Sequence, residues 1–401
     1  MSSVTADVVI IGGGPAGLTA AIALADAGLE TALVAKPPHA TDHRTTALLA
    51  GSVKALDTLG VWERCREHAA PLRVLRLVDD TARLLRAPEV RFAASEIGLD
   101  AFGHNIENRF LVAALENRAR RLPALTIIGG EAEAVAFAHA QVTVRMSGGG
   151  LVSARLAIGA DGRRSLCRAA AGIDTDGMSY PQTALTLNLA HSRPHQDTST
   201  EFHTEAGPFT LVPLPGNRSS LVFVADSAEA PRLAALPDAD LSAEIERRSH
   251  SILGKIAVEA GRGVFALAAA TARRFGARRL VLIGEAANVM APIGAQGLNL
   301  GLRDAATIAE LVVAAGRAGR DVGADELTAH YERMRRADVT SRTVAVDLLN
   351  RSLLSDFLPV QGARGLGLYL MDRIGPLRRT VMREGVAPAA SQPRLMRGKA
   401  L

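Results

Sequence analysis

The chain is poor in the residue types that mark several classes of protein. Among its 401 residues only Cys65 and Cys167 are cysteines, with no CxxC pair and no His/Cys cluster, so we expect no disulfide framework and no metal site. This cysteine usage is typical of a reducing cytoplasm. Aromatic residues make up 3%, too few for a protein that stacks nucleic-acid bases. No run reaches the roughly 18 apolar residues of a membrane span, and the opening MSSVTAD lacks signal-peptide features. We therefore expect a cytoplasmic protein that is soluble or peripheral on the cytoplasmic membrane.

Charge of one sign is not concentrated in a block either. The net charge is +5, but the arginines are scattered, which favours a solvated basic surface over a nucleic-acid partner and leaves contact with a membrane surface as the alternative. Hydrophobic residues make up 48% and charged residues 22%, as in ordinary globular proteins. A chain of 401 residues has room for two lobes.

The N-terminal pattern predicts an α/β fold with a parallel sheet. An apolar run from Asp7 to Ile11 is followed by a glycine-rich turn, a helical stretch closed by Gly28 and a second apolar run from Thr31 to Ala35. Thr45 or Thr46 is expected to cap a helix through LLAGSVKALDTL.

Short alternating runs between residues 180 and 225 predict an antiparallel sheet, which is the candidate substrate lobe. Beyond residue 305 the sequence predicts a mainly helical structure. We expect a discontinuous nucleotide-binding domain, an inserted substrate domain and a helical C-terminal region, with boundaries at 1–71, 100–175 and 275–345 for the first, 72–99 and 176–274 for the second, and 346–401 for the third.

The first glycine-rich turn is Gly12-Gly13-Gly14-Pro15-Ala16-Gly17. Gly12, Gly14 and Gly17 have the spacing at which glycine permits a tight turn, close approach of backbone to a pyrophosphate and close helix packing. The turn follows a predicted strand and opens a predicted helix, so its position as well as its spacing indicates dinucleotide binding.

An acidic residue about 20 positions further on usually binds the ribose, but here the second run ends in Ala35-Lys36. Lys36 can be read as a partner for the 2′-phosphate of NADP. The first motif alone therefore leaves FAD and NADP open.

A second motif, Gly159-Ala160-Asp161-Gly162-Arg163-Arg164-Ser165, ends another apolar run. Asp161 can accept hydrogen bonds from sugar hydroxyls while the arginines face phosphates. A simple Asp-Gly turn explains the same letters when they stand alone.

A third motif lies near residue 290. The run Leu280 to Ile283 leads into Gly284-Glu285 and then into the segment PIGAQGLN, which opens a long predicted helix. The N-terminus of that helix presents free N–H groups that stabilise negative charge, such as that on the pyrimidine edge of a reduced flavin.

Together these three motifs resemble the single-component FAD-dependent aromatic hydroxylases with the p-hydroxybenzoate hydroxylase fold. Two further segments, DHRTTALL and PIGAQGLNLGLRD, resemble the UbiH/UbiF-type hydroxylases of ubiquinone biosynthesis. The resemblance covers the chain to about residue 315. It implies a Rossmann-like FAD lobe, an antiparallel substrate lobe and a helical C-terminal part.

The resemblance also implies which residues bind the cofactor. Gly12, Gly14, Pro15, Ala16 and Gly17 would hold the FAD pyrophosphate. The other residues that it assigns to FAD are Arg44 at the phosphate or ribose region, Asp161 and Gly162 where FAD and nicotinamide pass, Gly284 and Glu285 at the ribityl chain, and Pro292, Gly294, Gly297, Leu298 and Asn299 at the isoalloxazine. Ala35 in place of the ribose-binding acid and Asn288 where relatives often carry His are departures from the pattern.

The reaction that the resemblance implies needs FAD, NAD(P)H as electron donor and O2, with a flavin C(4a)-hydroperoxide as the hydroxylating species. The implied substrate is a hydrophobic polyprenylated phenol or quinone precursor, in a homo-oligomer or a quinone-synthesis complex. Two alternatives share the nucleotide motifs: a flavin-dependent reductase or dehydrogenase of an isoprenoid, and a non-catalytic FAD-binding partner.

Residues of the substrate site are less marked in the sequence. Phe209, Pro213 and Leu214 could line an apolar pocket, and a place in the core explains them equally well. His203 and Tyr180 are more often surface or packing residues than catalytic ones. No general base is named from sequence. The arginine-containing tail, which includes LLSDFLPV and LGLYLM, fits either an amphipathic membrane contact or simple packing on the FAD lobe.

Overall fold

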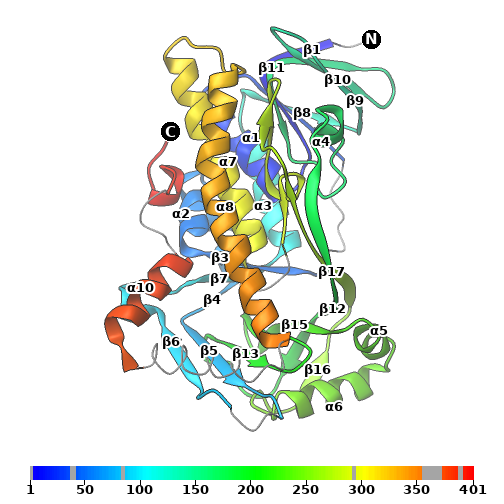
Figure 1. Ribbon diagram of the computed structural model, residues 1–401, viewed down its shortest axis with the longest axis vertical. Helices are drawn as coiled ribbons and strands as arrows, with labels where there is room; N and C mark the ends of the chain where they lie inside the picture. The colour runs from blue at the N-terminus through cyan, green and yellow to red at the C-terminus, as the bar shows by residue number, and fades with distance from the viewer. Residues whose placement is uncertain (1–2, 37–41, 83–85, 291–294, 355–372, 387–391) are drawn as a thin grey trace.

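A mainly parallel sheet forms the upper part of the computed structural model, which describes residues 3–36, 42–82, 86–290, 295–354, 373–386 and 392–401 (Figure 1). The strand order is β18-β19-β11-β1-β2-β8, with β10 and β9 extending from β11 as an antiparallel hairpin. These strands are β1 (Ser3–Ile11), β2 (Thr31–Ala35), β8 (Leu125–Gly129), β9 (Ala132–Phe137), β10 (Val142–Met146), β11 (Leu151–Gly159), β18 (Gly276–Ala277) and β19 (Leu280–Leu282). The carboxyl ends of β1, β11 and β19 are neighbours, which brings the three motifs to one edge of this sheet.

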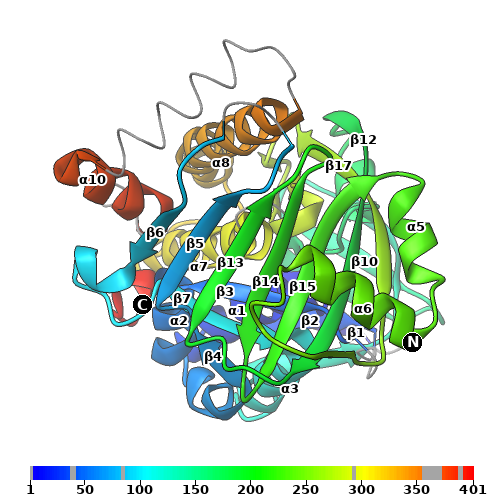
Figure 2. The same ribbon diagram turned by 90° about the horizontal axis from the view of Figure 1, so that it is seen from below.

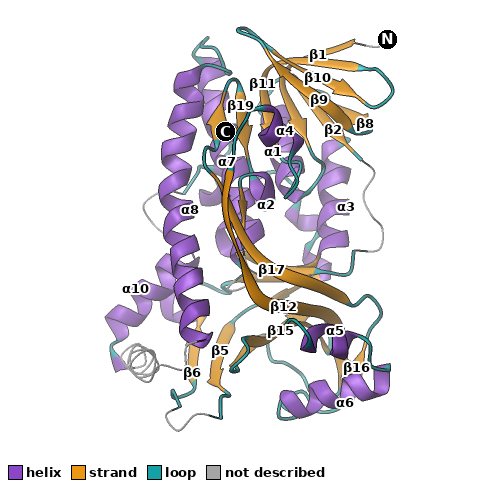
Figure 3. Cartoon of the chain, turned by 45° about the vertical axis from the view of Figure 1, so that its right-hand side comes forward, coloured by secondary structure: helices purple, strands orange, loops and turns teal. Residues whose placement is uncertain are grey.

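Helices pack against this sheet and bury its apolar runs. Helix α1 (Pro15–Asp26) contacts both α3 (Asn108–Ala119) and α7 (Gln296–Arg317), and α8 (Asp325–Leu354) lies along α7 (Figure 3). Val8, Val9 and Ile10 are fully buried, and most of α1 is buried with them. A small antiparallel sheet formed by β3 (Thr45–Leu49), β7 (Gly103–Glu107) and β4 (Ala69–Pro71) lies beside α2 (Ala50–Thr58).

The second large sheet forms the lower part of the molecule (Figures 1 and 2). Its order is β20-β17-β12-β15-β14-β13-β5-β6, and all the pairs except β13 with β5 are antiparallel. One face packs on α5 (Glu229–Ala234) and α6 (Asp238–Arg248). The strands are β5 (Val74–Asp79), β6 (Val90–Ala93), β12 (Thr175–His191), β13 (Thr198–His203), β14 (Pro208–Leu214), β15 (Arg218–Asp226), β17 (Gly263–Ala272) and β20 (Asn288–Val289), with β16 (Ile256–Val258) paired to β12.

The predicted fold class is confirmed: a parallel sheet with helices is joined to an antiparallel sheet, and helices follow at the C-terminal end. One local expectation is wrong. Thr45 and Thr46 do not cap a helix, because the segment Thr45–Leu49 pairs as a strand with Gly103–Glu107, and the helix begins only at Ala50. A long-range strand partner thus outweighs the local helical pattern.

Candidate active site

The turn after β1 is shaped by glycines that cannot be replaced without a clash. Gly12 has φ of +118°, and a Cβ there would overlap the carbonyl of Ala160 at the end of β11. A Cβ at Gly17 would overlap the Gly12 carbonyl. At Gly14, by contrast, a Cβ would meet nothing within 4 Å. The turn is therefore closed on the sheet side and open in front of α1, where Pro15 takes the first helical position and Ala16 follows.

The turn after β19 adjoins the first turn in space. It consists of the short helix η4 (Gly284–Ala286), and Gly284 has φ of +58°. A Cβ at Gly284 would lie 3.4 Å from Cβ of Ala16, and one at Gly301 of α7 would lie 3.1 Å from Cα of Gly284. The starts of α1 and η4 and the first turns of α7 thus meet in one place, although about 270 residues separate their sequences.

Helix α7 begins with an unusual backbone. Ala295 caps it in the left-handed region at φ of +54°, and a Cβ at Gly297 would meet nothing within 4 Å. Gly297 is exposed and Leu298 is half-buried, so the free N–H groups of this first turn are accessible. Pro292 and Gly294 lie outside the described residues.

The side chain of Asn299 is used within the protein. Its Oδ1 accepts from the Leu49 N–H at 2.8 Å and from the Ser52 hydroxyl at 2.7 Å, and its Nδ2 donates to the Ala47 carbonyl at 2.8 Å. These bonds attach the start of α7 to β3 and α2. Only the backbone of Asn299 is left for a cofactor.

The carboxylate of Asp161 is also occupied. It accepts from the Ser165 hydroxyl at 2.6 Å and from the Cys167 N–H at 3.0 Å, and so caps the short helix α4 (Leu166–Ala170). Gly162 has φ of +79° and is open on its Cβ side. Arg168 of α4 donates to the Ala286 carbonyl at 2.9 Å, which ties this loop to η4.

Arg44 forms a fork-like ion pair with Asp42, with both N···O distances at 2.8 Å. The hydrogen bond to Asp42 raises the pKa of Arg44, and the field of Glu285 adds to that rise. The guanidinium carbon lies 5.8 Å from the ring centre of Phe265 on β17. Arg44 therefore bridges the turn after β19 and the antiparallel sheet.

A cleft of about 210 Å³ lies between the two large sheets at this point. Arg44, Arg163 and the exposed Glu285 border it from the nucleotide side. The face of the antiparallel sheet that points away from α5 and α6 supplies side chains from alternate positions of three strands. These are Ala184, Thr186 and Asn188 of β12, Ser220 and Val222 of β15, and Phe265 and Leu267 of β17.

Phe209, Pro213 and Leu214 are buried and do not line the cleft. Phe209 packs with Phe202 and Phe223 in the core under α5 and α6, at ring-centre distances of 6.0 and 5.3 Å. The signal for the correct face was present in TALTLNLA, where leucines alternate with Thr186 and Asn188. The strand pattern alone does not say which of the two faces is covered by helices.

Some polar groups in the cleft form hydrogen bonds within the protein and others do not. Asn188 donates to the His43 carbonyl at 3.0 Å, and Ser220 Oγ accepts from Asn105 at 3.1 Å. Among the described residues, the hydroxyl of Thr186 and the imidazole of His43 have no hydrogen-bond partner, and both residues line the cleft. His43 was not singled out from sequence, because a lone His beside an arginine carries no pattern.

The other polar residues considered from sequence have structural partners. His203 lies 2.8 Å from Glu201 and is almost fully buried. Lys36 forms a surface pair with Glu131 at 2.8 Å. Tyr180 packs beside the small core that includes Leu267. Asn288 accepts from Thr271 at 2.6 Å.

A buried ion-pair network lies behind the turn after β19. Asp304 of α7 accepts from the Gly284 N–H at 3.0 Å and from Arg335 of α8 at 2.6 Å. Arg335 also donates to Asp338 at 2.6 Å, and both side chains of the Arg335–Asp304 pair are 3% exposed.

The same network reaches the start of α7. Asp338 accepts from Arg303 at 3.2 Å and from Arg342 at 3.0 Å, and Arg342 donates to Gln296 at 2.9 Å. Helix α8 therefore supports both η4 and the first turn of α7.

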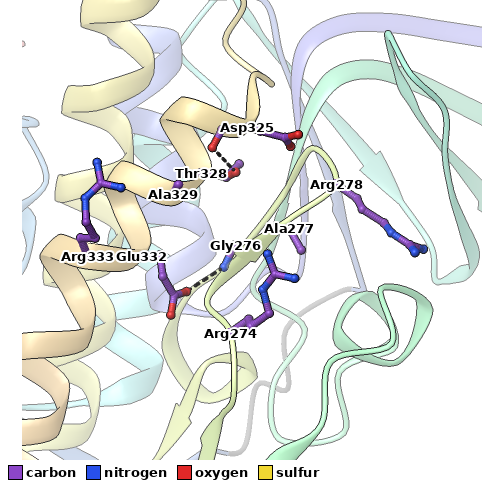
Figure 4. A pocket seen from close by; sticks show the side chains of 9 residues that line it. All are labelled: Arg274, Gly276, Ala277, Arg278, Asp325, Thr328, Ala329, Glu332 and Arg333. Carbon is purple, nitrogen blue, oxygen red and sulfur yellow. Dashed lines mark hydrogen bonds between the residues drawn. The ribbon is translucent and has the colours of Figure 1, made fainter.

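A larger hollow, about 520 Å³, lies between α8 and the turn of the β18–β19 hairpin (Figure 4). Arg274, Arg278 and Arg333 line it, and their side chains point in different directions. It contains none of the predicted site residues and lies at the opposite end of β19 from Gly284.

Two features are absent from the described residues. They contain no group of three or more His, Cys, Asp or Glu side chains placed to hold a metal ion. No helix among them combines the length and the apolar character that crossing a bilayer requires.

The two sheets, the paired turns and the cleft between them define an FAD-binding flavoprotein with the p-hydroxybenzoate hydroxylase architecture. The solved structure of p-nitrophenol 4-monooxygenase from Pseudomonas putida has this fold, with a TM-score of 0.76 at 20% identity over 96% of this chain and 97% of that one. The family model described as an FAD binding domain matches residues 5–345.

Among curated proteins, the chain is 39% identical to ubiquinone hydroxylase UbiL of Rhodospirillum rubrum, over 98% of this chain and 93% of that one. It is 29% identical to 3-demethoxyubiquinol 3-hydroxylase of Escherichia coli, over 96% and 99%. The chain therefore belongs to the FAD-binding family and, within it, to the group of these FAD-dependent monooxygenases. The predicted resemblance and the FAD cofactor are confirmed.

Proposed function

We propose that the protein hydroxylates the aromatic ring of a polyprenylated phenol in ubiquinone biosynthesis, with NAD(P)H and O2 as co-substrates. The observation that carries this proposal is the cleft, in which Arg44 and Glu285 of the nucleotide side face a sheet surface with one aromatic ring, several small residues and unpaired polar groups. The names and high coverage of the relatives support the pathway.

The residues present fit FAD. The open position at Gly14 in front of α1 suits the pyrophosphate, with Gly12, Pro15, Ala16 and Gly17 shaping the turn. The open first turn of α7 at Gly297 and Leu298 suits the electron-rich end of the flavin. Bound FAD would supply oxygen activation, which protein side chains do not provide.

The remaining cofactor residues receive narrower roles in this proposal. Glu285 binds the ribityl hydroxyls, and Arg44 exchanges part of its pairing with Asp42 for the cofactor. Asp161 positions Gly162 and α4 through its two hydrogen bonds rather than by direct contact. Asn299 holds the first turn of α7 in place. Pro292 and Gly294 are proposed to contact the isoalloxazine ring, as the sequence resemblance implies.

The substrate lies on the cleft face of the antiparallel sheet in this proposal. Phe265 offers its ring to the aromatic nucleus, and the hydroxyls of Thr186 and Ser220 bind the phenol oxygen. His43 accepts the phenol proton, because its imidazole lines the cleft and has no partner among the described residues. A phenolate ring is more electron-rich and is therefore more readily hydroxylated.

We propose the same domain boundaries that the sequence predicts. Segments 1–71, 100–175 and 275–345 bind FAD, segments 72–99 and 176–274 bind substrate, and residues 346–401 form an additional helical region. A cytoplasmic location and assembly into a homo-oligomer or quinone-synthesis complex are part of the proposal and await fractionation and mass measurement.

The test is turnover of the purified FAD-loaded protein with a short-chain prenylated phenol under labelled oxygen. We expect NAD(P)H oxidation coupled to product that contains one labelled oxygen atom. Turnover without oxygen would favour the reductase or dehydrogenase alternative. A protein that takes up no FAD would favour the non-catalytic alternative and would contradict the proposal at its first step.

A further inference from the structure

The cleft face of the antiparallel sheet continues beyond the residues that border the cleft. Thr186 of β12 lies opposite Val222 of β15, and both line the cleft. Val222 in turn lies opposite Thr210 of β14, and Thr210 lies opposite Glu201 of β13. Residues directly opposite each other on neighbouring strands share one face of a sheet. These four residues therefore form one row across the sheet, which we call the cross-strand row.

The neighbours of Thr210 and Glu201 along their strands confirm this face. Phe209 and Leu211 flank Thr210, and Phe202 follows Glu201; all three belong to the core under α5 and α6. Because successive side chains of a strand point to opposite faces, Thr210 and Glu201 point to the cleft side. Both are partly exposed, whereas the three core residues are at most 2% exposed. The polar surface of the cleft thus extends two strands further.

Glu201 is held as a carboxylate by two partners. Its Oε1 lies 2.8 Å from Nε2 of His203, and its Oε2 accepts from the Thr210 hydroxyl at 3.3 Å. Burial opposes ionisation of Glu201, but the hydrogen bond and the charge of His203 outweigh it, so the pKa of Glu201 lies below its usual value. An ionised carboxylate only accepts hydrogen bonds, and Nε2 of His203 therefore carries the proton of its bond.

The direction of these hydrogen bonds determines what Thr210 can offer to a ligand. Its single hydroxyl proton is donated to Glu201, so the Thr210 oxygen has only lone pairs left. A ligand group at this place must therefore donate a hydrogen bond. A carbonyl or an ether oxygen would bring lone pairs against lone pairs and would lose its hydrogen bonds to water without replacement.

The spacing along the cross-strand row suits a ring that carries two oxygens. Thr186 and Thr210 are two strands apart, which is about 10 Å at roughly 4.8 Å per strand. An aromatic ring with hydroxyls on opposite carbons fills that span when each hydroxyl makes one hydrogen bond of about 2.8 Å. Val222 lies between the two threonines and offers an aliphatic surface to the face of the ring.

We propose that Thr210, oriented by Glu201 and His203, binds the second oxygen of the substrate ring and accepts a hydrogen bond from it. The substrate class is then a hydroquinone, with one hydroxyl at Thr186 and the other at Thr210. Its methyl ether, the quinone and a phenol without the second oxygen are poorer ligands. Thr210 contacts the substrate, whereas Glu201 and His203 are positioning residues. This assignment rests on the proposed function, which places the aromatic ring in the cleft.

The experiment is a binding titration of the full-length, FAD-loaded protein without oxygen, so that no turnover occurs. The three ligands are a short-chain prenylated hydroquinone, the same compound with its second hydroxyl methylated, and the phenol that lacks the second oxygen. We expect the hydroquinone to bind about tenfold more tightly than either of the others, the effect of one hydrogen bond in a chain that ends on a charge. The change in flavin fluorescence measures the three affinities.

Two variants separate this hydrogen bond from the shape of the site. Thr210→Val keeps the shape and removes the hydroxyl, so the three affinities should agree within about twofold. In Glu201→Gln the amide N–H donates to Thr210, whose hydroxyl proton then turns to the ligand, and the preference should shift towards the methyl ether by about tenfold. Thr200→Val, on the covered face of β13, is the matched control and should bind like the wild type. All variants are compared at equal FAD occupancy.

Equal affinities in the wild type, or the same preference in Thr210→Val as in the wild type, overturn the assignment and leave the proposed hydroxylation standing. An unchanged preference in Glu201→Gln overturns the positioning roles. If none of the three ligands binds, the ring has no place in the cleft, and the proposed function fails together with the assignment. The expected preferences without labelled oxygen in the product remove the hydroxylation alone.

Discussion

Glu285 is an exposed carboxylate at the meeting point of the two glycine-rich turns, and its field reaches Arg44. In the proposed site it binds the ribityl chain, so Glu285→Ala should weaken FAD binding about tenfold, the loss of one hydrogen bond to a charged group. Fluorescence titration of the apoprotein with FAD measures this. Glu131→Ala, which also removes an exposed acid, is the control. Equal FAD affinity in both variants would remove the role of Glu285.

His43 is the proposed proton acceptor, and its backbone carbonyl is held by Asn188. His43→Gln keeps a polar side chain of similar reach but cannot take up a proton, and we expect kcat to fall about a hundredfold. FAD affinity and KM should change little. Stopped-flow spectra of a phenol substrate should show the bound phenolate in the wild type and not in the variant. Bound phenolate in both would contradict the role of His43.

Residues of the site differed in how well the sequence predicted them. Gly12 and Gly17 were accessible to sequence reasoning, because their spacing is a local pattern of one strand-turn-helix unit. The clash that excludes a side chain at Gly17 lies within that unit, whereas the one at Gly12 is with the distant carbonyl of Ala160. Asn299 was predicted by its place on α7, but its side-chain partners lie about 250 residues away and are invisible to local patterns. Asp161 was predicted to follow an apolar strand, and it does follow β11, but the sequence did not indicate that its carboxylate caps α4.

Helices α7 and α8 are joined by buried charges, of which Arg335 is central. Arg335→Met would leave Asp304 and Asp338 buried without this partner, and we expect a loss of about 3–5 kcal/mol in unfolding free energy. Thermal or urea denaturation measures it. Arg333→Met on the exposed side of α8 should lie within about 0.5 kcal/mol of the wild type. A small effect of Arg335→Met would show that the pair adds no net stability.

The attachment of α10 (Gly375–Val386) to the edge of the antiparallel sheet should depend on pH. The hydrogen bond from Arg378 holds the pKa of Glu96 below its usual value of 4.5. A carboxyl group whose pKa is lower in the folded state contributes stability above the unfolded pKa, and loses it as pH falls through the folded pKa. Amide exchange in α10, corrected for intrinsic rates, should therefore be constant from neutral pH to about pH 5 and rise below that.

The Glu96→Gln variant is the matched comparison for this pH dependence. It keeps a hydrogen-bond acceptor for Arg378 but has no proton to gain, so its α10 exchange should be faster at neutral pH and flat as pH falls. Identical profiles in the variant and the wild type would mean that another group controls the detachment.

Elements of regular local pattern were predicted well and those defined by distant partners were not. The run Thr31 to Ala35 is a strand with the predicted bounds. The segment Thr45–Leu49 has a helical pattern but becomes β3, because β7 offers it a full set of strand hydrogen bonds. The face of β12 that lines the cleft was likewise undetermined until α5 and α6 were placed on the other face.

The free energy of unfolding of the whole molecule should rise when FAD binds to both the turn after β1 and the turn after β19. A ligand at about 100 times its Kd adds roughly 2.7 kcal/mol, which corresponds to about 3 °C in Tm for a chain of this size. FMN contains the flavin but lacks the adenosine and the pyrophosphate link, so it should shift Tm much less at the same concentration. A thermal-shift assay with both compounds tests this. Equal shifts would contradict the role of Gly12 to Gly17.

The meeting of the two turns also fixes when the site can exist during synthesis. The phosphate-side turn leaves the ribosome first, but its sheet lacks β11 until residue 159 and β19 until residue 282. The first turns of α7 complete the place where FAD would lie. If FAD binds at the proposed site, it can therefore be loaded only late in the synthesis of the chain. A fragment that ends before Gly284 would retain the Gly12–Gly17 motif but would lack the proposed flavin site. We therefore expect that the nucleotide-binding part cannot be transferred to another protein as an N-terminal fragment.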